Sequence, residues 1–406
     1  MKYRKIEKTG EELSLLGYGC MRYPRKNGRI DYKRTKNQII FAIENGVNYF
    51  DTAYMYPGSE EVLGKVLAHN YKDKTYRDYV KIASKLPMLS VKNRPQMDEI
   101  FKKELKRLKT DFIDYYYLHS LNLNQWKTLK NELICFLNDL KKNGSIKNVG
   151  FSFHGNLKDF KEIIDDYDWD CVMIQYNYLD ENYQAGSKGL DYAYDKGLAI
   201  VIMEPLRGGT LANKLPKEGI KLINSFPIKR TPAQWAFSWV MNNPKVHTVL
   251  SGMNKESEIT ENIATASAIN NNGNNNGNNN LFDDDENNLI NSLKEEFNKN
   301  IVVNCTSCGY CLPCPQGVDI PTAFSSLNDK TIFSGIDSLK ALIQYLNINL
   351  GNDSLASNCT KCRICESKCP QHINIINNLD LVKNRLEKSY LIVLFKIGHF
   401  ILSKVL

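Results

Sequence analysis

The sequence predicts an α/β fold, a (β/α)8 TIM barrel followed by a small α-helical domain that contains two cysteine-rich runs. Three observations predict this arrangement. Strand-like and helix-like segments alternate eight times between residues 15 and 268, and an asparagine-rich stretch then interrupts the pattern at 270–280. Beyond it, two short runs hold eight of the chain's 11 cysteines. Strands that alternate with helices predict a parallel sheet, and eight units in about 260 residues match the usual size of such a barrel.

Eight short segments are the predicted barrel strands. Each is rich in apolar, β-branched or aromatic residues and precedes a segment with helical spacing. In chain order they are Leu15–Cys20, Val47–Asp51, Val80–Lys85, Phe112–His119, Ile146–Phe151, Cys171–Tyr176, Ala199–Met203 and Val246–Leu250. Residues 1–13 are expected to form a hairpin at the bottom of the barrel. A doubly wound open sheet is the alternative, but no G-x-G-x-x-G follows the first strand to support it.

Composition divides the chain into four regions. They are the barrel at 1–268, an asparagine-rich spacer with a helix at 269–299, the cysteine-rich domain at 300–376 and an apolar C-terminal helix at 377–406. The spacer cannot build a core. The last run, Tyr390–Leu406, is apolar but interrupted by lysines, and it is shorter than the roughly 20 clean residues that span a bilayer. It predicts a helix docked on this protein or on a partner, with a membrane-surface helix as the alternative.

The cysteine runs have the spacing of iron–sulfur ligands. The first, from Cys305, reads C-T-S-C-G-Y-C-L-P-C-P, and the second, from Cys359, reads C-T-K-C-R-I-C-E-S-K-C-P. The second has the C-x2-C-x2-C-x3-C-P spacing of bacterial two-cluster ferredoxins, in which three thiolates hold one cluster and the fourth crosses to the other. By that logic one [4Fe–4S] cluster takes Cys305, Cys308, Cys311 and Cys369. The other takes Cys359, Cys362, Cys365 and Cys314.

The first run departs from this spacing by one residue, because only two residues separate Cys311 from Cys314. Four-cysteine zinc sites, or disulfides, are the alternative. Zinc usually takes C-x2-C pairs from separate hairpins, so the spacing favours a ferredoxin-like domain with two [4Fe–4S] clusters. The remaining cysteines, Cys20, Cys135 and Cys171, stand in apolar contexts that predict buried structural thiols.

Bulk composition narrows the function classes. The formal charge is +8, with lysine and arginine scattered rather than blocked, which argues against a nucleic-acid partner. The N-terminal segment has no apolar run typical of a secretory signal. Crowded thiols without such a signal predict a reducing, cytoplasmic environment.

Four polar side chains are predicted to meet at the top of the barrel, where active sites of this fold lie. Asp51, Lys85 and His119 end the second, third and fourth predicted strands, and Tyr56 follows in the loop D-T-A-Y-M-Y-P-G-S-E. An ammonium beside a phenol favours loss of the phenolic proton, and a buried carboxylate keeps that amine charged. An imidazole can orient a carbonyl oxygen. The set suits proton donation to a carbonyl as hydride reaches its carbon.

The segment F-D-T-A-Y-M-Y with S-E-E-V-L-G, the S-K at a strand end and the L-H that follows resemble the aldo-keto reductase family over roughly residues 1–268. The resemblance implies that Tyr56 is the general acid, that Lys85 and Asp51 tune it, and that His119 orients the substrate. A barrel followed by two cluster motifs resembles a ferredoxin-fused branch of that family, which covers nearly the whole chain. In that branch the shortened C-x2-C-P of the first run recurs.

The same resemblance implies a set of nucleotide contacts. Gln175 matches the contact to the nicotinamide amide, Ser152 matches the serine of the neighbouring strand-end motif, and Arg207 lies in the loop on the pyrophosphate side. The segment at the adenosine end contributes Gly252, Lys255, Glu261 and Asn262. Phe153 replaces the usual asparagine, and Met203 stands where an aromatic residue often stacks on nicotinamide. Glu258 stands where many relatives carry an arginine for the 2′-phosphate of NADPH. The resemblance therefore implies NADP or NAD as cofactor without deciding between them. His154 also stands at a strand end and is a further candidate contact to cofactor or substrate.

These observations lead to an oxidoreductase hypothesis. The barrel performs NAD(P)H-linked chemistry on a small carbonyl or alcohol substrate, while the clusters relay electrons to or from an external redox partner. The alternatives are a carbonyl reductase with structural or sensing clusters, and a non-catalytic electron-transfer subunit. Hydride carries two electrons whereas a cluster takes one at a time. A flavin (FMN) at the barrel top is therefore a further cofactor hypothesis, although no residue pattern demands it. Peripheral membrane contact through the C-terminal helix is a partner hypothesis.

Overall fold

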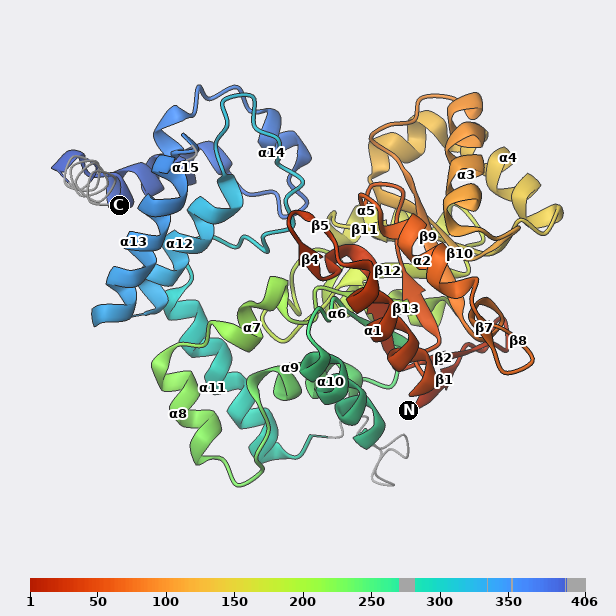
Figure 1. The fold of residues 1–406 in the computed structure, drawn as a ribbon, viewed down its shortest axis with the longest axis horizontal. Helices are drawn as coiled ribbons and strands as arrows, with labels where there is room; N and C mark the ends of the chain where they lie inside the picture. The colour runs from red at the N-terminus through yellow and green to blue at the C-terminus, as the bar shows by residue number, and fades with distance from the viewer. Residues whose placement is uncertain (270–281, 334, 352, 391, 393–406) are drawn as a thin grey trace. The chain divides into compact units, whose positions relative to one another are not determined.

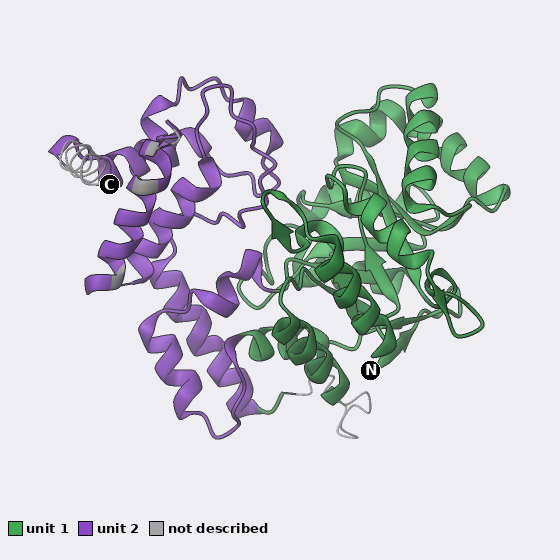
Figure 2. Ribbon diagram, in the orientation of Figure 1, with its two compact units in different colours: residues 1–205, 233–283 green, residues 206–232, 284–406 purple. Residues whose placement is uncertain are grey.

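The computed structural model describes residues 1–269, 282–333, 335–351, 353–390 and 392. The asparagine-rich stretch at 270–280 and most of the apolar run Tyr390–Leu406 therefore lie outside the described residues. The chain forms two compact units, shown in green and purple in Figure 2. Unit 1 comprises 1–205 and 233–283, and unit 2 comprises 206–232 and 284–406. Residues 206–232 thus belong to the same unit as the two cysteine-rich runs.

Unit 1 contains a closed barrel of eight parallel strands, which confirms the predicted fold class (Figure 1). In chain order these strands are β3 (Leu16–Gly19), β6 (Tyr49–Asp51), β9 (Lys81–Pro87), β10 (Ile113–Leu121), β11 (Ile146–Phe153), β12 (Cys171–Gln175), β13 (Ala199–Met203) and β14 (Thr248–Ser251). Each pairs with the next, and β14 returns to β3 to close the ring. All eight predicted strands are present.

Three antiparallel hairpins accompany the barrel. They are β1 (Tyr3–Lys5) with β2 (Glu12–Ser14), β4 (Arg25–Lys26) with β5 (Arg29–Ile30), and β7 (Asn70–Tyr71) with β8 (Lys74–Thr75). The first is the hairpin predicted for residues 1–13. Its Ile6 and Leu13 are fully buried and join the apolar cluster that fills the barrel interior.

Eight helices alternate with the strands of unit 1. They are α1 (Tyr32–Glu44), α2 (Ser59–Leu67), α3 (Arg94–Leu108), α4 (Leu123–Lys142), α5 (Leu157–Asp165), α6 (Gly186–Asp195), α9 (Pro232–Met241) and α10 (Glu256–Ala268). Polar side chains begin several of them, since Asn93, Asn122 and Asn156 each accept a hydrogen bond from a first-turn N–H group. Cys135 is exposed on α4, so its predicted burial was wrong: Leu133, Phe136 and Leu137 provide the buried face of that helix.

Tyrosines fill the lower barrel interior. The hydroxyls of Tyr49 and Tyr117 lie 2.8 Å apart, and both side chains are fully buried. Gly150 makes room for this packing. A Cβ atom there would lie 2.9 Å from the Tyr117 ring and 2.5 Å from the Cys171 sulfur. The interior is therefore a packed core that leaves the strand ends to hold the polar groups.

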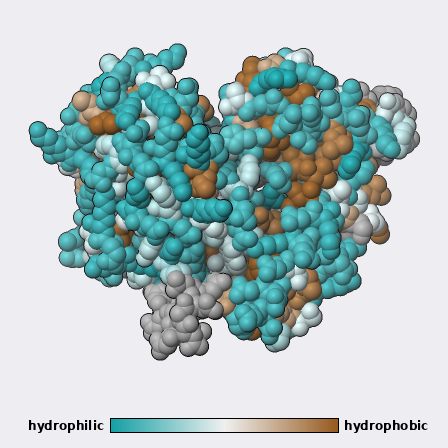
Figure 3. Space-filling view, turned by 180° about the vertical axis from the view of Figure 1, so that it is seen from behind, coloured by the Kyte–Doolittle hydropathy of each residue, from teal (hydrophilic) through white to brown (hydrophobic). Residues whose placement is uncertain are grey.

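Unit 2 is helical. Its helices are α7 (Thr210–Asn213), α8 (Lys217–Ser225), α11 (Asp284–Asn300), α12 (Ile320–Ile332), α13 (Gly335–Gly351), α14 (Ile364–Lys368) and α15 (Ile375–Leu386). Helices α12, α13 and α15 share an apolar core with the cysteine-rich runs, in which Phe324, Tyr345 and Val382 are buried. In the view of Figure 3, hydrophobic residues gather over unit 2 within a mostly hydrophilic surface.

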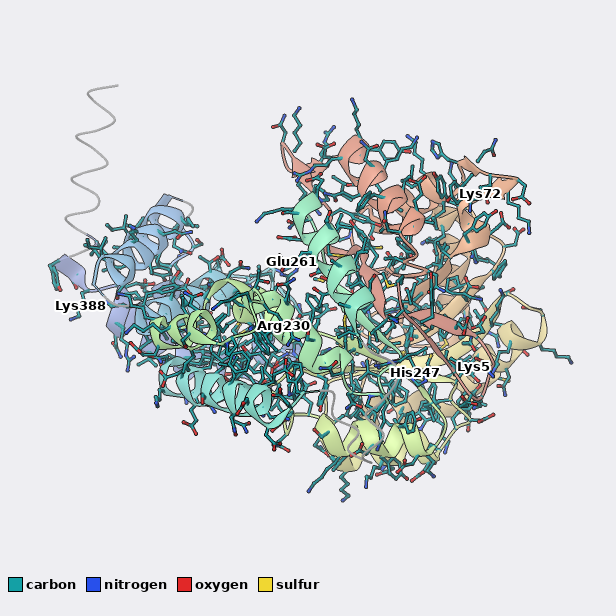
Figure 4. All side chains as sticks on the ribbon, turned by 90° about the horizontal axis from the view of Figure 1, so that it is seen from below. Lys5, Lys72, Arg230, His247, Glu261 and Lys388 are labelled. Carbon is teal, nitrogen blue, oxygen red and sulfur yellow. The ribbon has the colours of Figure 1, made fainter. Side chains whose placement is uncertain are left out.

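Segment 206–232 is built into unit 2 by several contacts. Helix α8, which the sequence analysis did not anticipate, packs against α11, where Gly219 faces Leu293. The guanidinium of Arg230, labelled in Figure 4, pairs with the buried carboxylate of Glu286 at 2.5 Å. In the part of the chain that is described, no helix is long and apolar enough to cross a membrane.

Candidate functional site

Strand alternation places three of the predicted catalytic side chains at the barrel top. Tyr49, Ala83 and Tyr117 belong to the interior cluster, one each on β6, β9 and β10. Because side chains alternate between the two faces of a strand, the residues two positions further along also face the interior. These residues are Asp51, Lys85 and His119. All three are buried, with between 1% and 6% of their surface exposed.

Asp51 and Lys85 form a buried ion pair. The Lys85 Nζ atom lies 2.5 Å from Asp51 Oδ1 and donates a second hydrogen bond to the backbone carbonyl of Thr52 at 2.7 Å. Burial raises the pKa of Asp51, and the Lys85 ammonium opposes that rise. A buried charge is costly unless it is paired and hydrogen-bonded, so each group of the pair is needed to keep the other charged.

Tyr56 and His119 lie beside this pair. The Tyr56 ring lies with its centroid 5.1 Å from Lys85 Nζ and meets the His119 ring edge-on, with 5.9 Å between centroids. Tyr56 is half-buried, whereas its three neighbours are buried. Burial, together with the charge of Lys85 and the nearby His154, holds the pKa of His119 well below its usual range. His119 is therefore neutral at pH 7 and can donate one N–H group or accept one hydrogen bond.

Two predicted nicotinamide contacts, Ser152 and Gln175, are buried at neighbouring strand ends of unit 1. The Ser152 hydroxyl accepts a hydrogen bond from the backbone N–H of Ser120 at 2.7 Å. The amide nitrogen of Gln175 donates to Asp180 Oδ2 at 2.8 Å, and the same carboxylate oxygen accepts from Asn177. Sequence reasoning missed Asp180 and Asn177, because nothing in their spacing marks them as supports for Gln175.

The predicted adenosine contacts lie at the start of α10. Glu258 accepts hydrogen bonds from the backbone N–H groups of Asn254 and Lys255, at 3.1 and 3.3 Å. Its carboxylate also lies 3.5 Å from the Lys255 ammonium. Asn262 is buried and donates to Ser251, whereas Glu261, labelled in Figure 4, is partly exposed. Gly252 is exposed, in the loop that leads to this helix.

Arg207 lies in unit 2 and contacts the first cysteine-rich run. It is 4% exposed and donates a hydrogen bond from its guanidinium to Asn304 Oδ1 at 2.8 Å. The next residue, Gly208, has φ +66°, and a Cβ atom there would lie 2.2 Å from the carbonyl oxygen of Thr306. Arg207, the predicted pyrophosphate contact, and the following Gly208 therefore pack closely on the two residues that flank Cys305.

Four cysteines from both runs surround one cavity in unit 2. Its walls include apolar side chains of α12, such as Phe324, and the following thiols: Cys305, Cys308, Cys311 and Cys369. This is the quartet that crossed ligation predicts. Burial raises the pKa of Cys305 to about 11 and that of Cys311 to about 12, so these thiols need a neighbouring positive charge, such as iron, to ionise near pH 7.

The two runs share one backbone pattern. Ser307 and Lys361, each before the second cysteine of its run, have φ of +55° and +61°. Gly309 and Arg363, each after it, have φ of +81° and +64°. In both runs the residue before the second cysteine donates its N–H to the first cysteine sulfur at 3.4 Å. Alternating backbone conformations of this kind turn N–H groups inward and bind anions, including iron–sulfur clusters.

Three cysteines of the second quartet also lie near one another. Cys359 and Cys314 both lie near enough to Cys365 to raise its pKa, although burial is the larger cause. In the described part of the chain, no group of three or more His, Cys, Asp or Glu side chains is arranged to hold a single metal ion. Zinc would need its sulfur ligands within about 2.3 Å of one point. Thiols that surround a cavity fit an iron–sulfur cluster better.

Comparison with known families places these two sites in a known architecture. Residues 15–271 match the model described as aldo/keto reductase family, and residues 304–376 match the 4Fe-4S dicluster domain. The first match covers more than half of the chain, so the protein belongs to the aldo/keto reductase family, with an iron–sulfur domain fused behind the barrel. It is an oxidoreductase that carries iron–sulfur clusters.

Individual relatives are distant. The chain is 23% identical over 311 residues to the NADH-specific methylglyoxal reductase of Escherichia coli, covering 65% of this chain and 93% of that one. It is 25% identical over 310 residues to the L-glyceraldehyde 3-phosphate reductase of E. coli O157:H7, covering 65% and 87%. An aldo-keto reductase structure from Bacillus halodurans aligns with TM-score 0.58 at 23% identity, over 72% of this chain and 96% of that chain. The likeness to this solved structure shows a shared fold and nothing beyond it.

Proposed function

We propose that the barrel reduces a small carbonyl compound with NADH, or oxidises the corresponding alcohol, with Tyr56 as the general acid. The observation that carries this proposal is the buried Asp51–Lys85 pair beside a half-buried tyrosine and a neutral histidine. Of these four side chains the tyrosine is the most exposed. The nicotinamide supplies the hydride when it is bound.

Each side chain of the candidate site has a separate role in this proposal. The His119 imidazole donates its N–H to the substrate oxygen and so orients the carbonyl. The Tyr56 hydroxyl gives its proton to that oxygen as hydride arrives at the carbon. Lys85 stabilises the negative charge left on the Tyr56 oxygen, and Asp51 holds the ammonium in place and charged. Ser152 and Gln175 are the groups proposed to hold the nicotinamide amide.

Replacement of the acid tests this assignment. Tyr56→Phe is expected to lower kcat for methylglyoxal, the compound in the name of one relative, by a factor of about 10² to 10⁴. Binding of NADH should be unchanged. The matched control is Tyr54→Phe, since Tyr54 lies two residues earlier and stacks on Arg107. Activity of Tyr56→Phe equal to wild type, with methylglyoxal and a panel of other aldehydes, would show that another group is the acid.

NADH is the proposed nucleotide because of Glu258. Its carboxylate accepts hydrogen bonds from the backbone N–H groups of Asn254 and Lys255, just before α10, at the position where the family resemblance predicts an arginine for the 2′-phosphate. A phosphate that bears nearly two negative charges would be repelled there. We expect NADH to bind at least about tenfold more tightly than NADPH, and Glu258→Arg to reverse or abolish the difference. Titration of both nucleotides against wild type, Glu258→Gln and Glu258→Arg measures this. Equal affinities in wild type would refute the preference.

We further propose that the clusters exchange electrons between the barrel reaction and an external carrier. The residues that would hold them are the two quartets of cysteines described above, and the clusters supply one-electron transfer. Oxidation of one hydride releases two electrons and one proton, so each of the two clusters would take one electron and the proton would pass to solvent. Support comes from segment 206–232, which follows the barrel strand β13 yet belongs to the unit of the clusters, where Arg207 and Gly208 contact residues on either side of Cys305.

An anaerobic titration separates the relay from its alternative. Cluster-loaded protein is titrated with NADH while the visible absorption and the EPR signal of the clusters are followed. Bleaching by NADH supports the relay. If NADH binds without bleaching while dithionite still reduces the clusters, the relay fails, and the protein is a carbonyl reductase whose clusters serve structure or sensing.

A further inference from the structure

The two cysteine-rich runs differ in their access to solvent. Every residue of the second run from 360 to 364 is exposed, and this stretch includes Cys362. Among the eight cysteines of the two runs, Cys362 alone is exposed, while those of the first quartet are half-buried. In the first run Thr306 is 1% exposed, while Ser307, Leu312 and Pro313 are exposed and none of the cysteines is. A cluster held by the second quartet therefore has a ligand at the protein surface.

The surface around Cys362 is basic. Lys361, Arg363 and Lys368 are exposed, whereas the first run contains no charged residue between 305 and 318. Lys361 pairs with Asp380 at 2.9 Å. The nearby Glu366 is partly buried and accepts a hydrogen bond from the backbone N–H of Ile376. Within the described residues, Arg363 and Lys368 form no ion pair. Two cations thus remain to attract an external anion.

Apolar side chains accompany these cations. Ile364 lies between Cys362 and Cys365 and is 44% exposed, and Leu312 lies two residues before Cys314 and is 39% exposed. Ile364 thus adjoins a ligand of the second quartet, whereas Leu312 directly follows Cys311 of the first quartet. Protein interfaces typically combine an apolar centre with a polar rim, and those of electron-transfer pairs are small and transient. We name the exposed surface of the second run the exchange face and define it by Lys361, Cys362, Arg363, Ile364 and Lys368.

We propose that the exchange face docks an acidic one-electron carrier protein and that the second cluster is the one that exchanges electrons with it. The inference rests on the proposed relay and names its partner. In each encounter one electron leaves the cluster and one enters the carrier, or the reverse, and no bond or proton changes. The positive rim selects the carrier because complementary charge speeds encounter and excludes wrong partners. A basic carrier would be repelled by the same rim.

The test uses the full-length, cluster-loaded protein with an acidic bacterial ferredoxin as probe and a basic cytochrome c as the opposite-charge probe. Binding is measured by surface plasmon resonance between about 50 and about 300 mM salt. We expect the ferredoxin to bind, with affinity that falls as salt rises, and the cytochrome to bind at least about tenfold more weakly. No binding of the ferredoxin, or equal binding of both probes, would overturn the proposal.

Paired variants locate the contact. Arg363→Asn with Lys368→Glu lowers the charge of the exchange face by three, and asparagine tolerates the positive φ at position 363. The control, Lys217→Asn with Lys221→Glu, makes the same charge change on the exposed surface of α8 in the same unit. We expect the first variant to weaken ferredoxin binding about tenfold or more and the control to leave it within about twofold. Equal effects of both would mean that overall charge, and not this face, attracts the probe.

Two controls keep the outcome readable. Iron content and reduction by dithionite must match wild type in Arg363→Asn with Lys368→Glu. The conservative variant Arg363→Lys with Lys368→Arg keeps both positive charges and should bind ferredoxin as wild type does. Failure of the relay gives a different result. In that case NADH fails to bleach the clusters while ferredoxin still binds at the exchange face. If NADH bleaches the clusters but Arg363→Asn with Lys368→Glu binds ferredoxin as wild type does, the exchange face is refuted and the relay stands.

Discussion

The buried ion pair of the barrel joins residues 34 positions apart in the chain, whereas each cysteine-rich run gathers three cysteines within seven residues. In the barrel, Asp51 and Lys85 meet because two parallel strands pair in the correct register. In unit 2, the backbone of each run bends around its own cysteines through residues with positive φ. The barrel site therefore depends on the whole sheet, and a cluster site depends mainly on a local loop and one crossing cysteine.

The largest expected effect is at that crossing cysteine. Cys369→Ser removes the ligand that the second run contributes to the first cavity. We expect loss of about half of the iron per chain, because one cluster retains all four thiolates. Iron and acid-labile sulfide assays measure this. Cys135→Ser, at an exposed cysteine outside both runs, is the control. Full iron content in Cys369→Ser would mean that the cluster has another fourth ligand.

Removal of one partner of the buried ion pair should have the next largest effect. Lys85→Met leaves the Asp51 carboxylate buried without its cation, which typically costs about 3–5 kcal/mol of unfolding free energy. Urea unfolding, followed by tyrosine and tryptophan fluorescence, measures this cost. The double variant Asp51→Asn with Lys85→Met should regain most of it. A Lys85→Met protein as stable as wild type would show that the pair does not hold the barrel top together.

Gly208→Ala tests the packing of segment 206–232 on the first run. The new Cβ would meet the Thr306 carbonyl oxygen, and alanine would be held at φ +66°. We expect a loss of about 2–4 kcal/mol together with weaker cluster retention. Gly197→Ala is the matched control, since Gly197 has φ +77° with open space around it, and strain alone costs about 1–2 kcal/mol. Equal losses in both variants would show that the contact with Thr306 adds nothing.

The last expected effect is a pH dependence of the barrel that is small over any single pH unit. Burial lowers the pKa of His247 to about 4, and its Nδ1 atom accepts a hydrogen bond from the Ile200 N–H, which requires the neutral ring. As pH falls from about 6.5 to about 4, His247 gains a proton in the unfolded chain but stays neutral in the folded chain. The contribution of His247 to the unfolding free energy therefore falls by about 1.4 kcal/mol for each pH unit. The lowered pKa of His119 acts in the same direction.

His247→Asn should reduce this slope, because asparagine can accept the same hydrogen bond without titrating. Urea unfolding at several pH values, with barrel fluorescence and cluster absorption recorded together, measures it. The barrel transition should respond to pH through these histidines. An unchanged slope in His247→Asn would assign the acid sensitivity to other groups.

Much of the candidate site could be predicted because it rests on short-range patterns. Cysteine spacing indicates cluster ligands because a cubane cluster must be wrapped by a short loop. Asp51, Lys85 and His119 could be placed because each ends an apolar strand, and parallel strands present their ends at one rim of a barrel. The eight strands were predicted for the same reason, since each is a short apolar run followed by helical spacing.

Other features were not predictable because they depend on which surfaces meet after folding. The spacing of residues 206–232 did not indicate that they would join the cluster unit, since Gly208 is recognisable as a contact only once Thr306 lies against it. The support of Gln175 by Asp180 is a side-chain contact without a motif. The exposure of Cys135 was missed because an apolar sequence context does not tell which face of α4 is buried.

The sequence by itself thus determined the fold class, the cluster ligands to be tested and the catalytic candidates, because strand alternation and cysteine spacing are local and periodic. The tertiary structure decided which units those residues belong to, which cysteine quartet shares a cavity, and which cluster run is open to solvent. Those properties arise from packing between segments far apart in the chain, where burial and close approach, rather than spacing, set the free energy.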